Sequence, residues 1–232
     1  MIKIYAININ FKLSSTTWND FLDIISKDRK KKINNYYFEK DKKHCIYAEL
    51  ILRYSLLKEY NINDKELEIE YNQYGKPKLK KYKNIYFNIS HSGNWVVCAL
   101  GKWEIGVDVE KIDTLSLNVA KNIFTKMEYN NLILCRENPE ELFYKLWTLK
   151  ESYVKAIGKG LQIPFSVLEF RFSNQTIYFY TNSTLNNQYD FVTYKIDQMH
   201  RVSICSLSSP IPLCENFCKK IIKPEQIIEF AR

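Results

Sequence analysis

The sequence predicts an α+β protein of two pseudo-symmetric lobes, each running strand, helix, helix and then antiparallel strands. Several short segments alternate apolar and polar residues, as half-buried strands do, and longer segments repeat apolar residues at helical spacing. The same element order appears in both halves of the chain, without a sequence repeat. At 232 residues the chain can form two lobes with a core each. We expect an N-terminal lobe over residues 1–103 and a C-terminal lobe over residues 104–232.

The first half begins with an alternating segment and then turns helical. Its predicted elements are a strand at 2–11, a helix from Thr17 to Ile33 that the basic run 27–32 closes, a helix at 39–60, and strands at 67–71, 85–90 and 95–100. Asn61 is expected to end the second helix. The linker 90–94 predicts a hairpin or near-hairpin between the last two strands.

The second half repeats this order. Its predicted elements are a strand at 104–110, helices at 117–135 and 140–157, strands at 167–172, 176–181, 189–196 and 201–207, and a short helix at 224–230. Asn138-Pro139 separates the two longer helices. The helix at 140–157 carries Lys150, Glu151 and Lys155 on neighbouring turns beside a regular apolar stripe.

Composition places the chain among folded globular proteins, with 46% hydrophobic and 15% aromatic residues. The net charge of +8 suits a polyanionic small molecule, an acidic protein or nucleic acid. Six cysteines without a CxxC pair, and only three histidines, do not favour a structural zinc site. The first residues alternate like a strand and lack the apolar block of a signal peptide, and no apolar run approaches the roughly 20 residues of a membrane span. We expect a cytoplasmic protein with no membrane association.

Two carboxylates share one face of a predicted strand. In Gly106-Val-Asp108-Val-Glu110 the strand period directs Asp108 and Glu110 to the same side, about 6–7 Å apart. Such a pair repels unless a cation or solvent separates its charges, so a metal site and a solvated strand edge both remain open. With Glu151 from the later helix, three hard oxygen ligands would suit Mg²⁺ or Mn²⁺.

The segment WTLKESYVK places Glu151 and Lys155 four residues apart on one helix, where an exposed ion pair is the structural alternative to a site. Ser90 and His91 stand at the end of a predicted strand beside Gly93, which could cradle a phosphate. A serine hydrolase is not favoured, because adjacent strand residues point to opposite faces and the chain has no GxSxG motif.

Five motifs occur in order: YGKP (74–77), FNISHSG (87–93), IGVDVEKI (105–112), FTKMEY (124–129) and WTLKESYVKAIGKGL (147–161). Together they resemble the 4′-phosphopantetheinyl transferases, in particular the surfactin-synthetase-activating type with two lobes in one chain. The resemblance spans nearly the whole sequence. It implies an enzyme that moves 4′-phosphopantetheine from coenzyme A to a serine hydroxyl of an apo acyl or peptidyl carrier protein and releases 3′,5′-ADP. It also implies an active site in the cleft between the lobes.

The resemblance assigns a role to each candidate site residue. Asp108, Glu110 and Glu151 would bind Mg²⁺, and Mn²⁺ is the alternative metal. The coenzyme A contacts would be Lys155, Lys150, Lys32 and Ser90 near the diphosphate, Arg29 and His91 at the 3′-phosphate, and Gly75, Lys76 and Pro77 beside the adenine. Arg29 stands where a lysine is expected. Cys45 replaces a hydroxyl residue or arginine, and His44 could substitute for it.

The carrier protein supplies the nucleophilic serine, and its proton needs an acceptor. Glu151, directly or through a metal-bound water, is the first candidate and Glu128 the second; Lys155 would neutralise charge on the diphosphate. The basic balance and the helix at 117–135, with Lys121 and Lys126, are expected to dock an acidic carrier protein. A monomer is expected, unlike the small trimeric holo-carrier synthases. A nucleic-acid-binding protein leaves the three carboxylates unexplained, and an inactive carrier-binding protein leaves the intact site residues unexplained.

Overall fold

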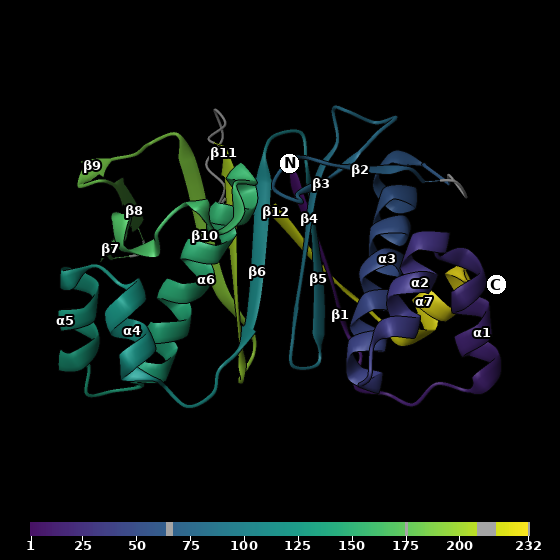
Figure 1. Cartoon of the computed structure of the whole chain (residues 1–232), viewed down its shortest axis with the longest axis horizontal. Coiled ribbons are helices and arrows are strands. Elements are labelled where there is room, and N and C mark those ends of the chain that lie inside the picture. The colour runs from purple at the N-terminus through teal and green to yellow at the C-terminus, as the bar shows by residue number, and fades with distance from the viewer. Residues whose placement is uncertain (64–66, 175, 208–216, 232) are drawn as a thin grey trace.

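The computed structural model describes residues 1–63, 67–174, 176–207 and 217–231. Two sheets stand side by side in the middle of the molecule (Figure 1). Helices α1, α2, α3 and α7 flank one sheet, and helices α4, α5 and α6 flank the other. This is the predicted α+β architecture, with helices on the outer side of each sheet.

The first sheet has the strand order β12-β1-β5-β4. Its strands are β1 (Ile2–Asn8), β4 (Tyr86–Ser92), β5 (Trp95–Gly101) and β12 (Phe217–Ile222). The helices beside it are α1 (Ser15–Ile24), α2 (Lys27–Asn35), α3 (Glu39–Tyr60) and α7 (Pro224–Phe230). A separate hairpin joins β2 (Ile69–Tyr71) to β3 (Pro77–Leu79). Asn61 ends α3 in the left-handed conformation, as expected for a helix C-cap.

The second sheet has the order β10-β11-β6, with all pairs antiparallel. Its strands are β6 (Ile105–Lys111), β10 (Tyr189–Asp197) and β11 (His200–Leu207). A small sheet follows from β7 (Leu168–Ser173), β8 (Thr176–Thr181) and β9 (Thr184–Leu185). The helical elements are α4 (Leu117–Ile123), α5 (Lys126–Leu134), α6 (Pro139–Ile157) and the short 3-10 turns η1 (Gly160–Gln162) and η2 (Phe165–Val167).

Three hydrophobic clusters hold these layers together. One lies between the first sheet and its helices, and one lies around α6 in the second half. The third joins the two sheets and includes Ile4, Val97, Val107 and Ile204. Every residue of β5 is buried because its alternate side chains enter the first and the third cluster. The two halves therefore share a continuous apolar interior.

Two predicted helices are each divided in two by an internal cap. The helix expected from Thr17 to Ile33 breaks at Ser26, whose side chain caps α2 by accepting the Arg29 N–H, while Ser14 caps α1. The basic run therefore begins a helix instead of closing one. The helix expected at 117–135 breaks before Thr125, which forms a capping box with Glu128. Apolar spacing alone missed both caps.

The last described segment crosses back to the first half of the chain. Strand β12, which was not predicted, pairs in parallel with β1, and Ile227 of the predicted helix α7 is fully buried in the N-terminal core. The predicted division after residue 103 assigns β12 and α7 to the C-terminal lobe. Their packing instead joins them to the N-terminal lobe. Sequence order could not reveal this, because a parallel pairing needs no local turn.

The strands around the predicted hairpin are longer than expected. β4 continues to Ser92, so Gly93 and Asn94 form the turn, with Gly93 at φ +57°. Helix α6 agrees with the prediction and ends at Gly158, which has φ +65°. Within the described ranges, no helix combines the length and apolarity needed to span a bilayer.

Candidate active site

Strand β6 presents its two acids toward helix α6. Asp108 is 1% exposed, Glu110 is half-buried, and the alternate residues Val107 and Val109 enter the core between the sheets. Gly106 lies on the same side as the acids. A Cβ atom there would be 2.0 Å from the Ser152 carbonyl oxygen, so only glycine lets α6 approach this closely.

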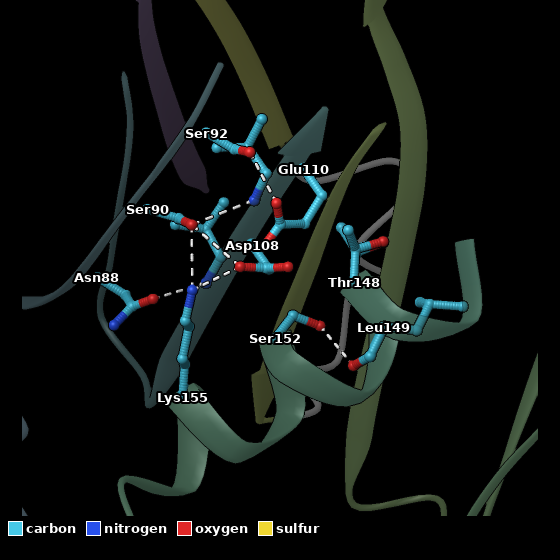
Figure 2. Close-up of polar contacts among 12 residues, drawn as sticks. Asn88, Ser90, Ser92, Asp108, Glu110, Thr148, Leu149, Ser152 and Lys155 are labelled. Carbon is cyan, nitrogen blue, oxygen red and sulfur yellow. Dashed lines mark hydrogen bonds and ion pairs between the residues drawn. The ribbon is translucent and has the colours of Figure 1, made fainter. Parts of the chain in front are cut away.

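Strand β4 meets β6 through side chains. Asn88 Oδ1, Ser90 Oγ and Ser92 Oγ accept the backbone N–H groups of three alternate β6 residues at 2.9, 3.2 and 3.0 Å. Ser90 also donates to Asp108 at 3.0 Å, and Ser92 donates to Glu110 at 2.7 Å (Figure 2). Each serine thus fixes one acid while it joins the two halves of the molecule.

Lys155 extends from α6 into this group. Its Nζ lies 2.5 Å from Asp108 Oδ1 and donates to Ser90 Oγ at 3.0 Å (Figure 2). Burial alone would lower the pKa of Lys155, but the carboxylates of Asp108, Glu151 and Glu110 raise it. Lys155 is therefore a charged ammonium, and Glu151 and Lys155 belong to a half-buried cluster around the buried Asp108, not to the exposed pair that was the structural alternative.

The three carboxylates carry more negative charge than the single ammonium of Lys155 can neutralise. Burial, and then the charge of Asp108, raise the pKa of Glu110 to about 7, and the same two causes raise that of Glu151. Asp108 Oδ2 is buried and has no hydrogen-bond partner in the described part of the chain. A divalent cation would relieve both conditions, and carboxylate oxygens are the donors that Mg²⁺ prefers. Among the described residues, no three His, Cys, Asp or Glu side chains are already arranged as a metal site. The residues therefore suit a divalent cation because of their carboxylate oxygens and not because of a preformed arrangement.

Two histidines lie on the other face of β4. The rings of His44 and His91 stack at 4.4 Å, and His44 Nε2 is 3.1 Å from the Gly93 carbonyl oxygen. The His91 side chain is exposed, yet desolvation by the surrounding chain and the charges of His44 and Lys155 lower its pKa. Ser90 and His91 point to opposite faces, as the strand period predicted.

The neighbouring residue Cys45 is buried and contacts Arg29. The guanidinium donates to Cys45 Sγ at 3.7 Å and lies 3.4 Å from a Glu49 carboxylate oxygen. Arg29 and Lys32 line a hollow of about 810 Å³ beside α2 and β2, and Lys32 Nζ lies 6.0 Å from the centre of the Tyr71 ring. The structure thus places Arg29 and Lys32 around one hollow on the first half of the chain.

The YGKP loop contacts the end of α6. Gly75 has φ +86°, and Lys76 Nζ donates to the Ala156 carbonyl oxygen and to that of Ile105, the latter at 3.2 Å. Lys76 and Pro77 also line a cavity of about 280 Å³. The Lys76 ammonium is therefore directed into the protein, which the resemblance did not predict.

Lys150 and Glu128 lie away from the acids of β6. Lys150 is 0% exposed, and its Nζ contacts Glu128 Oε2 at 2.6 Å and two backbone carbonyl oxygens. Glu128 also accepts the backbone N–H groups of Thr125 and Phe170, both at 2.9 Å. An enclosed pair with these partners stabilises the C-terminal core. These contacts hold both side chains away from the acids of β6, so the predicted roles of Lys150 near the diphosphate and of Glu128 as a second proton acceptor stay predictions.

Ser92 and Asn88 are the site residues to which sequence reasoning gave no role. Their signal was present: Asn88, Ser90 and Ser92 alternate along one strand, so three polar side chains share the face that meets β6. Without knowledge of the neighbouring strand, that face is indistinguishable from a solvated edge.

Comparison with known proteins gives matches along most of the chain. A family model described as the 4′-phosphopantetheinyl transferase superfamily matches residues 104–205. A second, described as 4′-phosphopantetheinyl transferase, N-terminal, matches residues 10–102. The chain is similar to 4′-phosphopantetheinyl transferase Sfp of Bacillus subtilis (strain 168), with 29% identity over 91% of this chain and 95% of that protein.

One further relative and one solved structure also match parts of the chain. The transferase gsp of Aneurinibacillus migulanus is 34% identical over 71% of this chain and 69% of its own. Among solved structures, holo-[acyl-carrier-protein] synthase of Thermotoga maritima matches with a TM-score of 0.38 and 20% identity, over 46% of this chain and 63% of that one.

Proposed function

The chain belongs to the 4′-phosphopantetheinyl transferase superfamily, and from this membership we propose how its own residues perform the transfer. The substrates are coenzyme A and a serine hydroxyl of an acyl or peptidyl carrier protein. The serine oxygen attacks the phosphorus that bears pantetheine, the bond from that phosphorus to the bridging oxygen breaks, and 3′,5′-ADP leaves. The active site lies where β4, β6 and α6 meet.

The observation that carries this proposal is the crowding of Asp108, Glu110 and Glu151 around Lys155. Raised carboxylate pKa values and the unpartnered Asp108 Oδ2 describe a group of acids that lacks positive charge. In structural ion-pair networks, most buried oxygens have a hydrogen-bond partner. These acids are suited to hold Mg²⁺, or Mn²⁺, in the working enzyme.

Asp108, Glu110 and Glu151 would be the metal ligands. The bound ion would supply charge neutralisation for a diphosphate. Ser90 and Ser92 orient the two acids on β6, which limits the motion needed to bind the ion. Lys155, released from Asp108, is then free to contact a diphosphate oxygen with its ammonium.

Glu151 is the proposed proton acceptor. Its place on α6, four residues before Lys155, puts its carboxylate near Asp108, so it could take the proton directly or through a metal-bound water. Positioning and charge neutralisation account for most of the catalysis of phosphoryl transfer, so a single base and one firmly charged lysine are sufficient.

The nucleotide end of coenzyme A is proposed to lie over the first half of the chain. Arg29, His44 and His91 would contact the 3′-phosphate, Lys32 and Ser90 the diphosphate, and the backbone of the YGKP loop the adenine. Arg29 and Lys32 line the same hollow, His44 and His91 stack on each other, and Arg29 contacts Cys45, the residue after His44 in the chain. A phosphate dianion would favour protonation of the histidine pair.

The carrier protein is proposed to dock on α4 and α5. Lys121 and Lys126 are exposed there, beside the exposed apolar side chains of Leu117, Val119 and Met127. Acidic helices would be attracted by the lysines and held by the apolar contacts. We propose a cytoplasmic monomer that uses neither nucleic acid nor a membrane.

The decisive experiment combines the protein with coenzyme A, Mg²⁺ and apo carrier proteins from fatty-acid, polyketide and peptide synthesis. Mass spectrometry of the carriers should show the addition of one phosphopantetheine group. Glu151→Gln should abolish the addition, whereas the exposed substitution Glu137→Gln should not. The proposal fails if no carrier gains mass.

The docking surface is tested with the same assay. Reversing the charges of Lys121 and Lys126 to glutamate should raise the KM for the carrier about tenfold and leave the KM for coenzyme A unchanged. An unchanged carrier KM would place docking on another surface.

A further inference from the structure

The loop between β2 and β3 is organised by one side chain. Asn72 Oδ1 accepts the N–H groups of Tyr74 and Lys76 at 2.9 and 2.8 Å, and the Asn72 N–H donates to the Lys76 carbonyl oxygen at 3.0 Å. These bonds fix the conformation of residues 72–76, with Gly75 in the left-handed region. The loop is therefore a rigid unit.

This unit contacts the C-terminus of α6. Asn72 Nδ2 donates to the Gly158 carbonyl oxygen at 2.8 Å, and Lys76 Nζ donates to the Ala156 carbonyl oxygen. The last carbonyl groups of a helix have no partner within the helix. A loop from the first half of the chain thus caps the helix that carries Glu151 and Lys155, and its cation lies at the negative end of the helix dipole.

The Lys76 ammonium also reaches the start of β6. It donates to the Ile105 carbonyl oxygen at 3.2 Å, three residues before Asp108, while Ala156 follows directly after Lys155. One cation therefore connects the two elements that carry the acids and the lysine of the site.

The end of α6 is shaped to receive this lysine. A Cβ atom on Gly158 would lie 2.5 Å from Lys76 Cδ, so the methylene stem of the lysine crosses the glycine in direct contact. Burial lowers the pKa of Lys76 to about 8, which leaves it mostly protonated at neutral pH. A side chain held in this way is not available to reach a ligand.

We propose that Lys76, together with Asn72, is a positioning residue that holds the end of α6 against the start of β6 and so aligns Lys155 and Glu151 with Asp108. A nucleotide on the outer face of the loop would help to set the position of the loop. The loop would in turn set the position of the reacting groups. The catalytic part of this inference rests on the proposed function, whereas the clamp itself does not.

Two variants separate the clamp from a nucleotide contact. Lys76→Met keeps the buried stem and removes the three donors of the ammonium. Asn72→Asp keeps the Oδ1 acceptor that organises the loop but replaces the donor to Gly158 with a second acceptor. Lys78→Met removes an exposed lysine from the same hairpin and is the matched control.

The first measurement needs neither substrate nor metal. Hydrogen exchange followed by mass spectrometry should show amides 154–158 of both clamp variants exchanging about tenfold faster than those of the control. The second is steady-state transfer, where kcat should fall about tenfold to a hundredfold and the KM for coenzyme A should change less than about threefold.

Two results would overturn the proposal. A raised KM for coenzyme A with unchanged kcat would make Lys76 a nucleotide contact, and unchanged exchange at 154–158 would remove the clamp. If the unaltered protein transfers nothing to any carrier, the proposed function fails, and the exchange measurement still decides the clamp. Recovery of kcat in Lys76→Arg would support the role of the charge.

Discussion

Lys155 and the acids around it show how a single side chain can serve both stability and reaction. Its ammonium lies 2.5 Å from Asp108 Oδ1 and neutralises that carboxylate. Three carboxylates near one another oppose folding, because each raises the free energy of charging the others. The cluster is held together by the packing of α6 on β6 despite that repulsion, which is typical of functional sites.

The titration of Glu110 makes the unfolding free energy depend on pH, because repulsion among the carboxylates acts only when they are charged. Its pKa of about 7 in the folded protein exceeds the ordinary value of 4.5. The folded protein therefore binds this proton more tightly than the unfolded chain does. That stabilisation is complete below pH 4.5 and is lost as pH rises through 7. Between pH 5 and 8 the metal-free protein should lose about 2 kcal/mol of unfolding free energy relative to Glu110→Gln.

Urea denaturation of both proteins at the two pH values, with a chelator present, measures this difference. Changing the exposed Glu225 to Gln provides the control, for which the difference should be the same at both pH values. A difference for Glu110→Gln that is also independent of pH would contradict the expected titration.

Glu128 and Lys150 form the opposite case, an ion pair whose partners are all satisfied. Glu128→Gln should destabilise the protein by about 3–5 kcal/mol, because it leaves the ammonium of Lys150 buried without its counter-charge. Transfer activity per folded molecule should stay within about threefold of normal, since neither residue reaches the acids of β6. Calorimetry and single-turnover assays at low temperature measure the two effects; a large loss of kcat with normal stability would restore Glu128 as a proton acceptor.

At the scale of elements, the site depends on how closely a helix can approach a strand. Gly106 lets the α6 backbone lie against β6, and the capping residues Ser26 and Thr125 determine where neighbouring helices begin. Ser90 and Ser92 then join β6 to β4 through side chains. A small shift of α6 would separate Glu151 and Lys155 from Asp108 without changing any of these residues.

Gly106→Ala tests whether α6 must lie this close to β6. A methyl group at 2.0 Å from the Ser152 carbonyl oxygen and 2.4 Å from the Ala156 nitrogen must displace backbone atoms. We expect a loss of about 2–4 kcal/mol in unfolding free energy and at least about a tenfold loss of kcat. The conventional control is Ala120→Gly in α4, which should lower stability by about 1 kcal/mol without an effect on kcat. Normal kcat in Gly106→Ala would show that the helix spacing is not critical.

At the scale of the whole molecule, the two halves are joined at several places. β12 and α7 return to the first sheet and its core, Trp95 Nε1 donates to Asp197 at 2.6 Å, and the cluster between the sheets is continuous. The Lys76 loop adds a polar connection at the end of α6. The halves are therefore expected to unfold together.

The returning C-terminal segment can be tested with a matched pair of substitutions. Ile227→Ala removes a fully buried side chain and should cost about 2–5 kcal/mol, whereas Ile221→Ala, at a side chain that is 49% exposed, should cost less than about 1 kcal/mol. Equal small losses in chemical denaturation would show that α7 does not belong to the N-terminal core. A single transition for all variants would confirm cooperative unfolding of the halves.

Local patterns in the sequence determined much of this protein. The ends of α3 at Asn61 and of α6 at Gly158, and the common face of Asp108 and Glu110, follow from chain geometry over a few residues. Only the tertiary structure decided that Lys150 is enclosed, that Lys76 points inward and that β12 joins β1. Whether a charged side chain is buried depends on segments far along the chain, and no local period carries that information.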